Sequence, residues 1–409
     1  MHLDQTHLPL FTNLLILLVA ARLMGELFER MRQPAMIGEI LAGIILGPTV
    51  LNLIHRTEEI RVISEIGIFL LVIMAGLEIN VEDILKSLRG KNIIISIMAF
   101  FLPLISGFLT GYFFNRDLKT NLFIGLCVAI TALPVSIRIL MDLGRVNSDV
   151  GQKLVSVAIF DDVLALTLLG IILQTKGINA NLADLAQIGL MSLLKLVLFI
   201  AVLITSYLVI RKVSMKEDYI EKQLDRLLSV LRGREPLFAL FFVFVLVFAT
   251  ITESLGLHFI VGAFFASLLL SEKVVGTTHL TTIQNSTQGL AMGFLAPVFF
   301  AGIGLEFQFQ SIQDPGLLLA VLLVSYGSKI LGGFLGGSLA GLGRSTSLVL
   351  GIGLNARGIM ELVIANVAYK AGMISTEIFS ILVLMGIITT LTTPIALKRG
   401  FRYLEKSSA

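Results

Sequence analysis

Two adjacent carboxylates, Asp161 and Asp162, stand inside the apolar residues 150–173. That stretch is long enough to cross a bilayer, where ionisable side chains are costly and usually face a protein interior or a wet cavity. Neighbouring helix residues point about 100° apart, so one carboxylate can face a cavity while the other faces a partner. Without a nearby cation the two charges repel, and at least one binds a proton. A site that exchanges a proton for a metal cation needs this property; the alternative is a pair neutralised by structural salt bridges.

A second group of intramembrane charges lies later in the chain. Lys329 stands in the middle of an apolar stretch, where a lone ammonium needs a partner or must lose its proton. The carboxylates of residues 150–173 are the obvious partners. Arg357 and Glu361 are four residues apart, the spacing of a direct ion pair on a helix. We interpret that pair as a buried structural brace.

An interruption in the apolar residues 121–141 offers oxygen ligands. Pro134 has no N–H and its ring crowds the carbonyl of Ile130, so a kinked or unwound helix is predicted there. The freed carbonyls, and the hydroxyls of Thr131 and Ser136, then become candidate ligands for a cation.

A matching interruption occurs at residues 351–358, which contain three glycines and Asn355. Paired interruptions in the two halves of a membrane protein indicate a transporter binding site. The alternative is a pair of ordinary proline and glycine kinks, which are common in membrane helices.

The composition defines the elements that must hold these residues. The chain has 409 residues, of which 56% are hydrophobic and 14% are charged, and this is typical of an all-α polytopic membrane protein. A net charge of +3 is too small to indicate a nucleic-acid partner. We expect no enzyme and no cofactor, because no nucleophile–base set is visible. The single Cys127 excludes an internal disulfide, and a start without a basic region predicts no cleavable signal peptide.

Apolar windows predict about thirteen transmembrane spans in a single transporter domain covering residues 1–409. These spans lie near residues 8–28, 35–54, 60–80, 92–114, 121–141, 150–173, 187–210, 236–257, 258–271, 287–307, 315–341, 347–371 and 375–397. With a cytoplasmic C-terminus most Lys and Arg fall inside, so we expect the N-terminus outside and the inner (plasma) membrane as the location. The polar residues 211–235 predict an amphipathic helix that contacts membrane lipid on the cytoplasmic surface.

Weak internal repeats relate the two halves of the chain. Residues 37–43, 75–79 and 122–125 resemble residues 261–267, 303–307 and 348–351 at a nearly constant separation. The corresponding spans are seven apart, and an odd separation inverts the second copy across the membrane. Inverted repeats, here roughly residues 35–173 and 258–397, are typical of secondary transporters.

These motifs resemble a known family. Residues 33–48, residues 75–78, the Asp161–Asp162 pair and residues 356–361 are similar to the second family of the cation–proton antiporter superfamily. NapA-type sodium–proton antiporters, potassium-efflux proteins and plant cation–proton exchangers belong there. The resemblance implies an NhaA/NapA-like fold with two crossed discontinuous helices and a homodimer. It also implies that Asp162 is the cation ligand, with Asp161 paired to Lys329.

The resemblance implies a secondary antiporter for a monovalent cation and protons that works by alternating access. Potassium-efflux members tend to carry Gln-Asp at the acidic pair and append a nucleotide-binding domain; neither is found in this sequence, which favours Na⁺ and electrogenic exchange. Residues 131–136, however, are closer to the plant-exchanger pattern, so K⁺/H⁺ exchange remains an alternative. A channel or sensor that retains the antiporter fold is a more distant one. We expect Asp162 and Asp161 to hold the transported metal cation, with oxygen ligands from Thr131 and Ile130.

Overall fold

The computed structural model describes most of the chain. It covers residues 9–55, 57–79, 90–145, 148–174, 219–230, 235–255, 258–270 and 272–408, with five isolated positions between 190 and 205. In this part of the chain the regular secondary structure is helical. Among the described residues, eight helices are long and apolar enough to cross a membrane, and three further apolar helices, α2, α6 and α12, are shorter.

The described helices fall into two compact units. The first unit contains the start of α3 (Glu58–Glu78), most of α8 (Asp149–Leu173), α1 (Leu10–Arg30), α2 (Ala35–Leu46), α5 (Asn92–Phe113), α6 (Leu118–Ala129), α7 (Leu133–Asp142), α15 (Ala296–Glu306), α16 (Pro315–Leu339), α17 (Arg344–Gly353), α18 (Ile359–Lys370) and α19 (Thr376–Ser408). The second contains the ends of α3 and α8, α10 (Tyr219–Val230), α11 (Pro236–Ser254), α12 (Phe259–Leu269), α13 (Glu272–Val275), α14 (Thr277–Leu290) and most of a π-helical turn (Ala291–Leu295).

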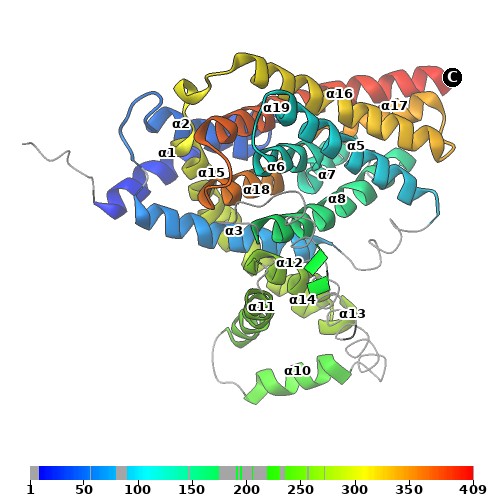
Figure 1. Cartoon of the computed structure of the whole chain (residues 1–409). Helices are drawn as coiled ribbons and strands as arrows, with labels where there is room; N and C mark the ends of the chain where they lie inside the picture. Colours follow the sequence, from blue (N-terminus) through cyan, green and yellow to red (C-terminus); the bar gives the residue numbers. More distant parts are fainter. Residues whose placement is uncertain are drawn as a thin grey trace, which may run out of the picture. The chain divides into compact units, whose positions relative to one another are not determined.

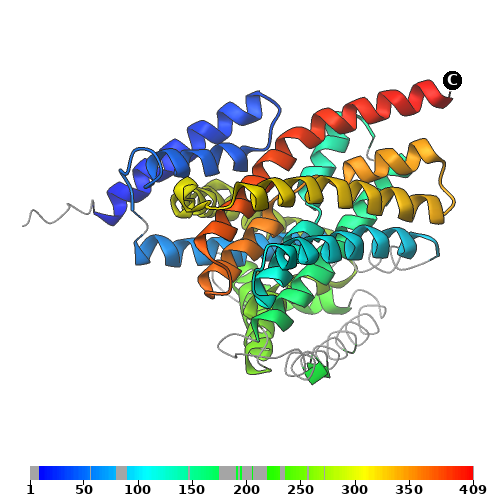
Figure 2. The same ribbon diagram turned by 45° about the horizontal axis from the view of Figure 1, so that its top comes forward.

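Close helix contacts organise the first unit. Helix α16 packs against α5 and α17, and α19 runs alongside both α16 and α17 (Figure 1). Helices α1 and α2 lie side by side, as Figure 2 shows, and α15 packs on both. A side chain on Gly351 of α17 would place its Cβ 2.4 Å from the carbonyl oxygen of Ile330 on α16. Only glycine therefore lets these two helices approach so closely beside Lys329.

The second unit has its own contacts. Helix α11 packs against α12 and α14, and α13 contacts both α10 and α14. The Gln284 amide of α14 donates a hydrogen bond of 3.0 Å to the Leu77 carbonyl near the end of α3. The helix α10 agrees with the amphipathic helix predicted for residues 211–235, and its Leu227 and Val230 side chains are exposed.

Most predicted spans coincide with helices, and the differences have local causes. The span predicted at residues 35–54 ends as a helix at Leu46, because Gly47 and Pro48 follow. The last helix continues to Ser408, well beyond the predicted residue 397. The seventh span, near residues 187–210, lies outside the described residues apart from isolated positions.

Candidate functional site

The first helix interruption lies just before Pro134. Helix α6 ends at Ala129, residues 130–132 are extended, and α7 begins at Leu133 with Pro134 in its first turn. The unwound residues 130–132 lie within the interruption predicted around Pro134 and just before the proline itself. Proline suits the first turn of a helix, because its missing N–H would have no partner there and its φ is already helical. Pro134 therefore starts the second half-helix instead of kinking a continuous one.

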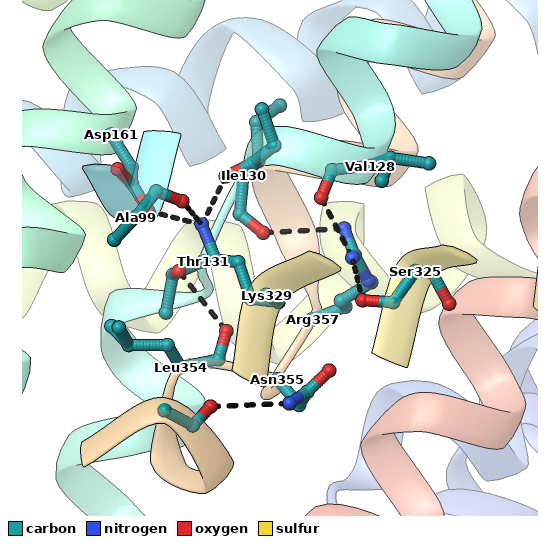
Figure 3. A network of polar contacts seen from close by, with 12 residues as sticks. Ala99, Val128, Ile130, Thr131, Asp161, Ser325, Lys329, Leu354, Asn355 and Arg357 are labelled. Carbon is teal, nitrogen blue, oxygen red and sulfur yellow. Dashed lines mark hydrogen bonds and ion pairs between the residues drawn. The ribbon is translucent and has the colours of Figure 1, made fainter. Parts of the chain in front are cut away.

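The second interruption lies against the first. Helix α17 ends at Gly353 and α18 begins at Ile359, so residues 354–358 connect two half-helices. The two connecting segments cross, and the N–H of Ala132 donates to the Ala356 carbonyl at 2.8 Å. The Thr131 hydroxyl donates to the Leu354 carbonyl at 3.2 Å (Figure 3). The crossing of two discontinuous helices that the family resemblance implied is present, and it satisfies backbone groups that neither half-helix can satisfy alone.

Lys329 of α16 reaches the acidic pair at this crossing. Its Nζ lies 2.8 Å from Oδ2 of Asp161 on α8, and both side chains are fully buried. The same ammonium donates to the Ala99 carbonyl at 3.0 Å and to the Ala129 carbonyl at the end of α6 (Figure 3). An ammonium has three protons to donate, so these three acceptors match its capacity.

Arg357 binds the same end of α6 from the other side. Its guanidinium donates to the carbonyls of Cys127, Val128 (2.7 Å) and Ile130 (3.3 Å), and to the Ser325 carbonyl of α16 (3.4 Å). The last carbonyls of a helix lack intrahelical donors and carry partial negative charge. Two cationic side chains from the second half of the chain, Lys329 and Arg357, thus hold the C-terminal end of the first interrupted helix.

The predicted brace between Arg357 and Glu361 was wrong in its geometry. Arg357 precedes α18 and therefore does not share a helix with Glu361, and no direct ion pair joins their side chains among the described residues. Arg357 binds backbone carbonyls instead. Glu361 lies fully buried in the first turn of α18, and neither carboxylate oxygen has a hydrogen-bond partner among the described residues.

The structure brings most remaining predicted residues to the crossing. Asp162 is 1% exposed on α8 next to Asp161. Asn355 is buried between the half-helices α17 and α18, and its amide nitrogen donates to the Gly351 carbonyl at 3.2 Å. Ser136 is buried in the first turns of α7, and its hydroxyl has no hydrogen-bond partner in the described part of the chain. The Ile130 carbonyl accepts from Arg357, so in this conformation it is not a free oxygen ligand.

Sequence reasoning missed contacts made by backbone carbonyls. The carbonyls of Ala99, Ala129 and Val128 bind the two cations, and apolar residue types give no signal for this. Thr390 of α19 was also missed; its hydroxyl donates to the Arg357 carbonyl at 2.7 Å. The available signal for this contact was a group of four threonines within residues 389–393 of an apolar helix.

The arrangement has the chemistry of a site for a hard monovalent cation. The Lys329 ammonium neutralises Asp161, and Asp162 adds a second buried carboxylate whose charge a cation or a proton could balance. The surrounding burial strengthens each of these electrostatic interactions. Among the described residues no cluster of three or more His, Cys, Asp or Glu is positioned for a metal ion.

Comparison with known proteins gives consistent results. Residues 14–400 match the family described as "Sodium/hydrogen exchanger, transmembrane". The Na(+)/H(+)-K(+) antiporter GerN of Bacillus cereus is 27% identical over 398 residues, covering 97% of this chain and 97% of that protein. The Na(+)/H(+) antiporter NhaS4 of Synechocystis sp. is 31% identical over 418 residues, covering 96% and 98%. Cation/H(+) antiporter 20 of Arabidopsis thaliana is 28% identical, and the match covers 93% of this chain but 47% of that longer protein.

A solved structure extends the likeness to the fold. The sodium proton antiporter MjNhaP1 from Methanocaldococcus jannaschii at pH 8 matches with a TM-score of 0.68, covering 95% of each chain at 19% sequence identity. At this identity the likeness concerns the fold alone. It agrees with the predicted all-helical antiporter architecture.

Proposed function

Because this chain belongs to the sodium/hydrogen exchanger transmembrane family, we propose that it exchanges a monovalent cation, Na⁺ in the first place, for protons across a membrane. The observation that carries this proposal is the buried ion pair of Lys329 and Asp161, set beside Asp162 where two interrupted helices cross. Charges in such a place are costly and are kept where they serve transport.

The proposed exchange depends on one carboxylate. Ionised Asp162 attracts a hard cation, and protonation removes the attraction, so cation and proton occupy the site in turn. The Thr131 hydroxyl, which lies at the crossing, is our candidate for an additional oxygen ligand. Alternating access would then carry the loaded site from one side of the membrane to the other.

The proposed stoichiometry depends on Lys329. When a cation binds at Asp162, the local charge becomes more positive and favours release of a proton from the ammonium. If Lys329 and Asp162 each release a proton for one entering Na⁺, one net positive charge crosses the membrane in each cycle. We favour this electrogenic exchange, because a buried lysine loses its proton much more readily than an arginine.

K⁺/H⁺ exchange is a second candidate. One relative of similar length is named for both Na⁺ and K⁺, and residues 131–136 differ from the pattern expected of sodium antiporters. A carboxylate with few additional oxygen ligands selects weakly between the two ions.

Orientation and assembly complete the proposal. The protein is a multi-pass membrane protein, and we place the C-terminus in the cytoplasm because most basic residues of the loops then lie inside. A homodimer in the inner (plasma) membrane is proposed from the family resemblance. Labelling of single cysteines introduced near each end checks the orientation, and light scattering of the detergent-solubilised protein checks the dimer.

Transport by purified protein in proteoliposomes tests the function. Addition of Na⁺, Li⁺ or K⁺ in turn should produce saturable, reversible proton flux, and the ion with the lowest KM identifies the substrate. Asp162→Asn should abolish this flux. The matched control is Asp149→Asn on the same helix, where the carboxylate is exposed and pairs with Lys153. Flux that persists in Asp162→Asn, or that does not saturate, would contradict the proposal.

A further inference from the structure

A cavity of about 220 Å³ lies in the first unit, where the end of α1 meets α7 and α19. Val135 and Ile139 of α7 and Ile395 of α19 contribute apolar walls, and Arg32 and Lys398 contribute positive charge. The lining contains no Asp or Glu, and neither cation forms an ion pair within the described residues. An entrance for cations would carry acidic groups, so this cavity suits an anion with an apolar part.

The backbone at Arg32 indicates that a cation is required there. The N–H groups of Arg32 and Gln33 donate to the carbonyls of Glu29 (2.9 Å) and Phe28 (2.8 Å), which is the Schellman ending of α1. Arg32 has φ 58° in this motif, at the position where glycine is usual. The other two described non-glycine residues with positive φ are asparagines, which tolerate this conformation. The chain thus keeps a long cationic side chain at an unfavourable position, a pattern that points to function.

Gln33 adds a polar group to the same wall. Its Oε1 atom is buried and has no hydrogen-bond partner among the described residues. A buried carbonyl oxygen without a donor is costly, and a ligand hydroxyl would satisfy it. The cavity therefore presents two donors for a phosphate, one acceptor for a hydroxyl and an apolar wall.

We propose that this cavity binds the headgroup of an anionic glycerophospholipid that carries a free hydroxyl, as phosphatidylglycerol does. The phosphate accepts hydrogen bonds from Arg32 and Lys398, and a headgroup hydroxyl donates to Oε1 of Gln33. The volume accommodates a headgroup and not a whole lipid, so the acyl chains run outside, over Ile395, which is 52% exposed. Helix α1 ends at Arg30, so the cavity is at the depth where a membrane span meets the headgroups.

Such a lipid would contact the half-helix that leads from the cation site. Helix α7 starts directly after Ala132, whose N–H bonds the crossing segment. A lipid held between α7 and the α1–α2 connection would therefore alter the exchange rate. This effect on rate rests on the proposed antiport, whereas the binding itself does not.

Native mass spectrometry of the delipidated full-length protein, titrated with phosphatidylglycerol, tests the binding. The double variant Arg32→Gln, Lys398→Gln should bind roughly tenfold or more weakly, because it loses both cations that attract the phosphate. The matched control is Arg30→Gln, Arg399→Gln, which removes two charges from the same helices outside the cavity lining. Ile139→Trp should also weaken binding by filling the cavity while both charges remain.

Headgroup chemistry separates the possible ligands. Gln33→Leu removes the acceptor for the headgroup hydroxyl, so it should weaken binding of phosphatidylglycerol. Binding of phosphatidic acid should stay unchanged, because its headgroup has no alcohol to donate to Gln33. Equal binding of zwitterionic phosphatidylethanolamine, or an equal loss in the control double variant, overturns the site. If inorganic phosphate displaces bound phosphatidylglycerol as effectively as added phosphatidylglycerol does, the ligand is a free anion and the lipid assignment is overturned. All of these readouts are independent of whether the protein transports Na⁺.

Discussion

The Nζ atom of Lys329 lies 2.8 Å from Oδ2 of Asp161, and neither side chain is exposed to solvent. The ammonium also donates to the carbonyls of Ala99 and Ala129, so it is fully bonded in its charged form. A neutral amine has one fewer proton to donate and must give up one of these contacts. Deprotonation of Lys329 is therefore coupled to the packing of α5, α6 and α8 around α16.

Removing one partner of this pair should destabilise the protein strongly. Lys329→Met leaves Asp161 charged and buried without compensation, and we expect a loss of ~3–5 kcal/mol in the free energy of unfolding. The double variant Lys329→Met, Asp161→Leu should recover much of that loss and still transport nothing. Thermal unfolding in detergent measures both. If the double variant is as unstable as the single one, the two residues are not coupled as the structure indicates.

The voltage dependence of exchange should show whether Lys329 releases a proton in each cycle. In the wild type, a membrane potential imposed on proteoliposomes should change the initial rate of exchange, because net charge moves. Lys329→Arg keeps a cation that does not deprotonate, so any remaining exchange should be insensitive to voltage. Initial wild-type rates that do not respond to potential would restrict the exchange to one proton for one cation.

Protons and cations should compete at Asp162. As the pH falls, protonation removes the negative charge that binds Na⁺, so the apparent KM for Na⁺ should rise. The proton on Asp162 alone raises it by up to roughly tenfold for each pH unit, and a second proton on Lys329 makes the rise steeper. The maximal rate at saturating Na⁺ should change much less over the same range. A KM that stays constant while the maximal rate falls would show that the two ions use separate groups.

Thr131 should contribute to cation affinity. Thr131→Val keeps the shape of the side chain but removes the hydroxyl that lies at the crossing. We expect a several-fold rise in KM, corresponding to the loss of one oxygen ligand worth about 1 kcal/mol. Thr389→Val is the control, because Thr389 is equally buried but bonds only its own helix. Equal effects of the two substitutions would assign Thr131 to packing.

Arg357 and Glu361 should not behave as a directly bonded ion pair. Arg357→Gln leaves carbonyls at the end of α6 without donors, and we expect a loss of ~1–3 kcal/mol in stability for each buried carbonyl that stays unsatisfied. Glu361→Gln, which keeps the shape of the side chain, should change stability by only ~1 kcal/mol. Thermal unfolding in detergent measures the stability of both variants. Similar large losses, together with non-additivity in the double variant, would restore the direct ion pair that the spacing predicted.

The sequence by itself determined the membrane class, most of the spans and the acidic pair. Long apolar stretches can do little else than cross a bilayer, and intramembrane charges such as Asp161, Asp162 and Lys329 are too costly to be incidental. The paired interruptions near Pro134 and Asn355 also followed from local chemistry. The helix breaks were less well placed, because the position of a break depends on which carbonyls find donors elsewhere.

Only the tertiary structure decided what binds those carbonyls. Helical spacing predicted that Arg357 pairs with Glu361, but the chain is extended at Gly358, and the guanidinium turns to the end of α6. The contacts of Lys329 with Ala99 and Ala129 were equally invisible, since backbone carbonyls are the same in every residue. Side-chain types indicate which charges need partners; the path of the chain in space determines which partners they find.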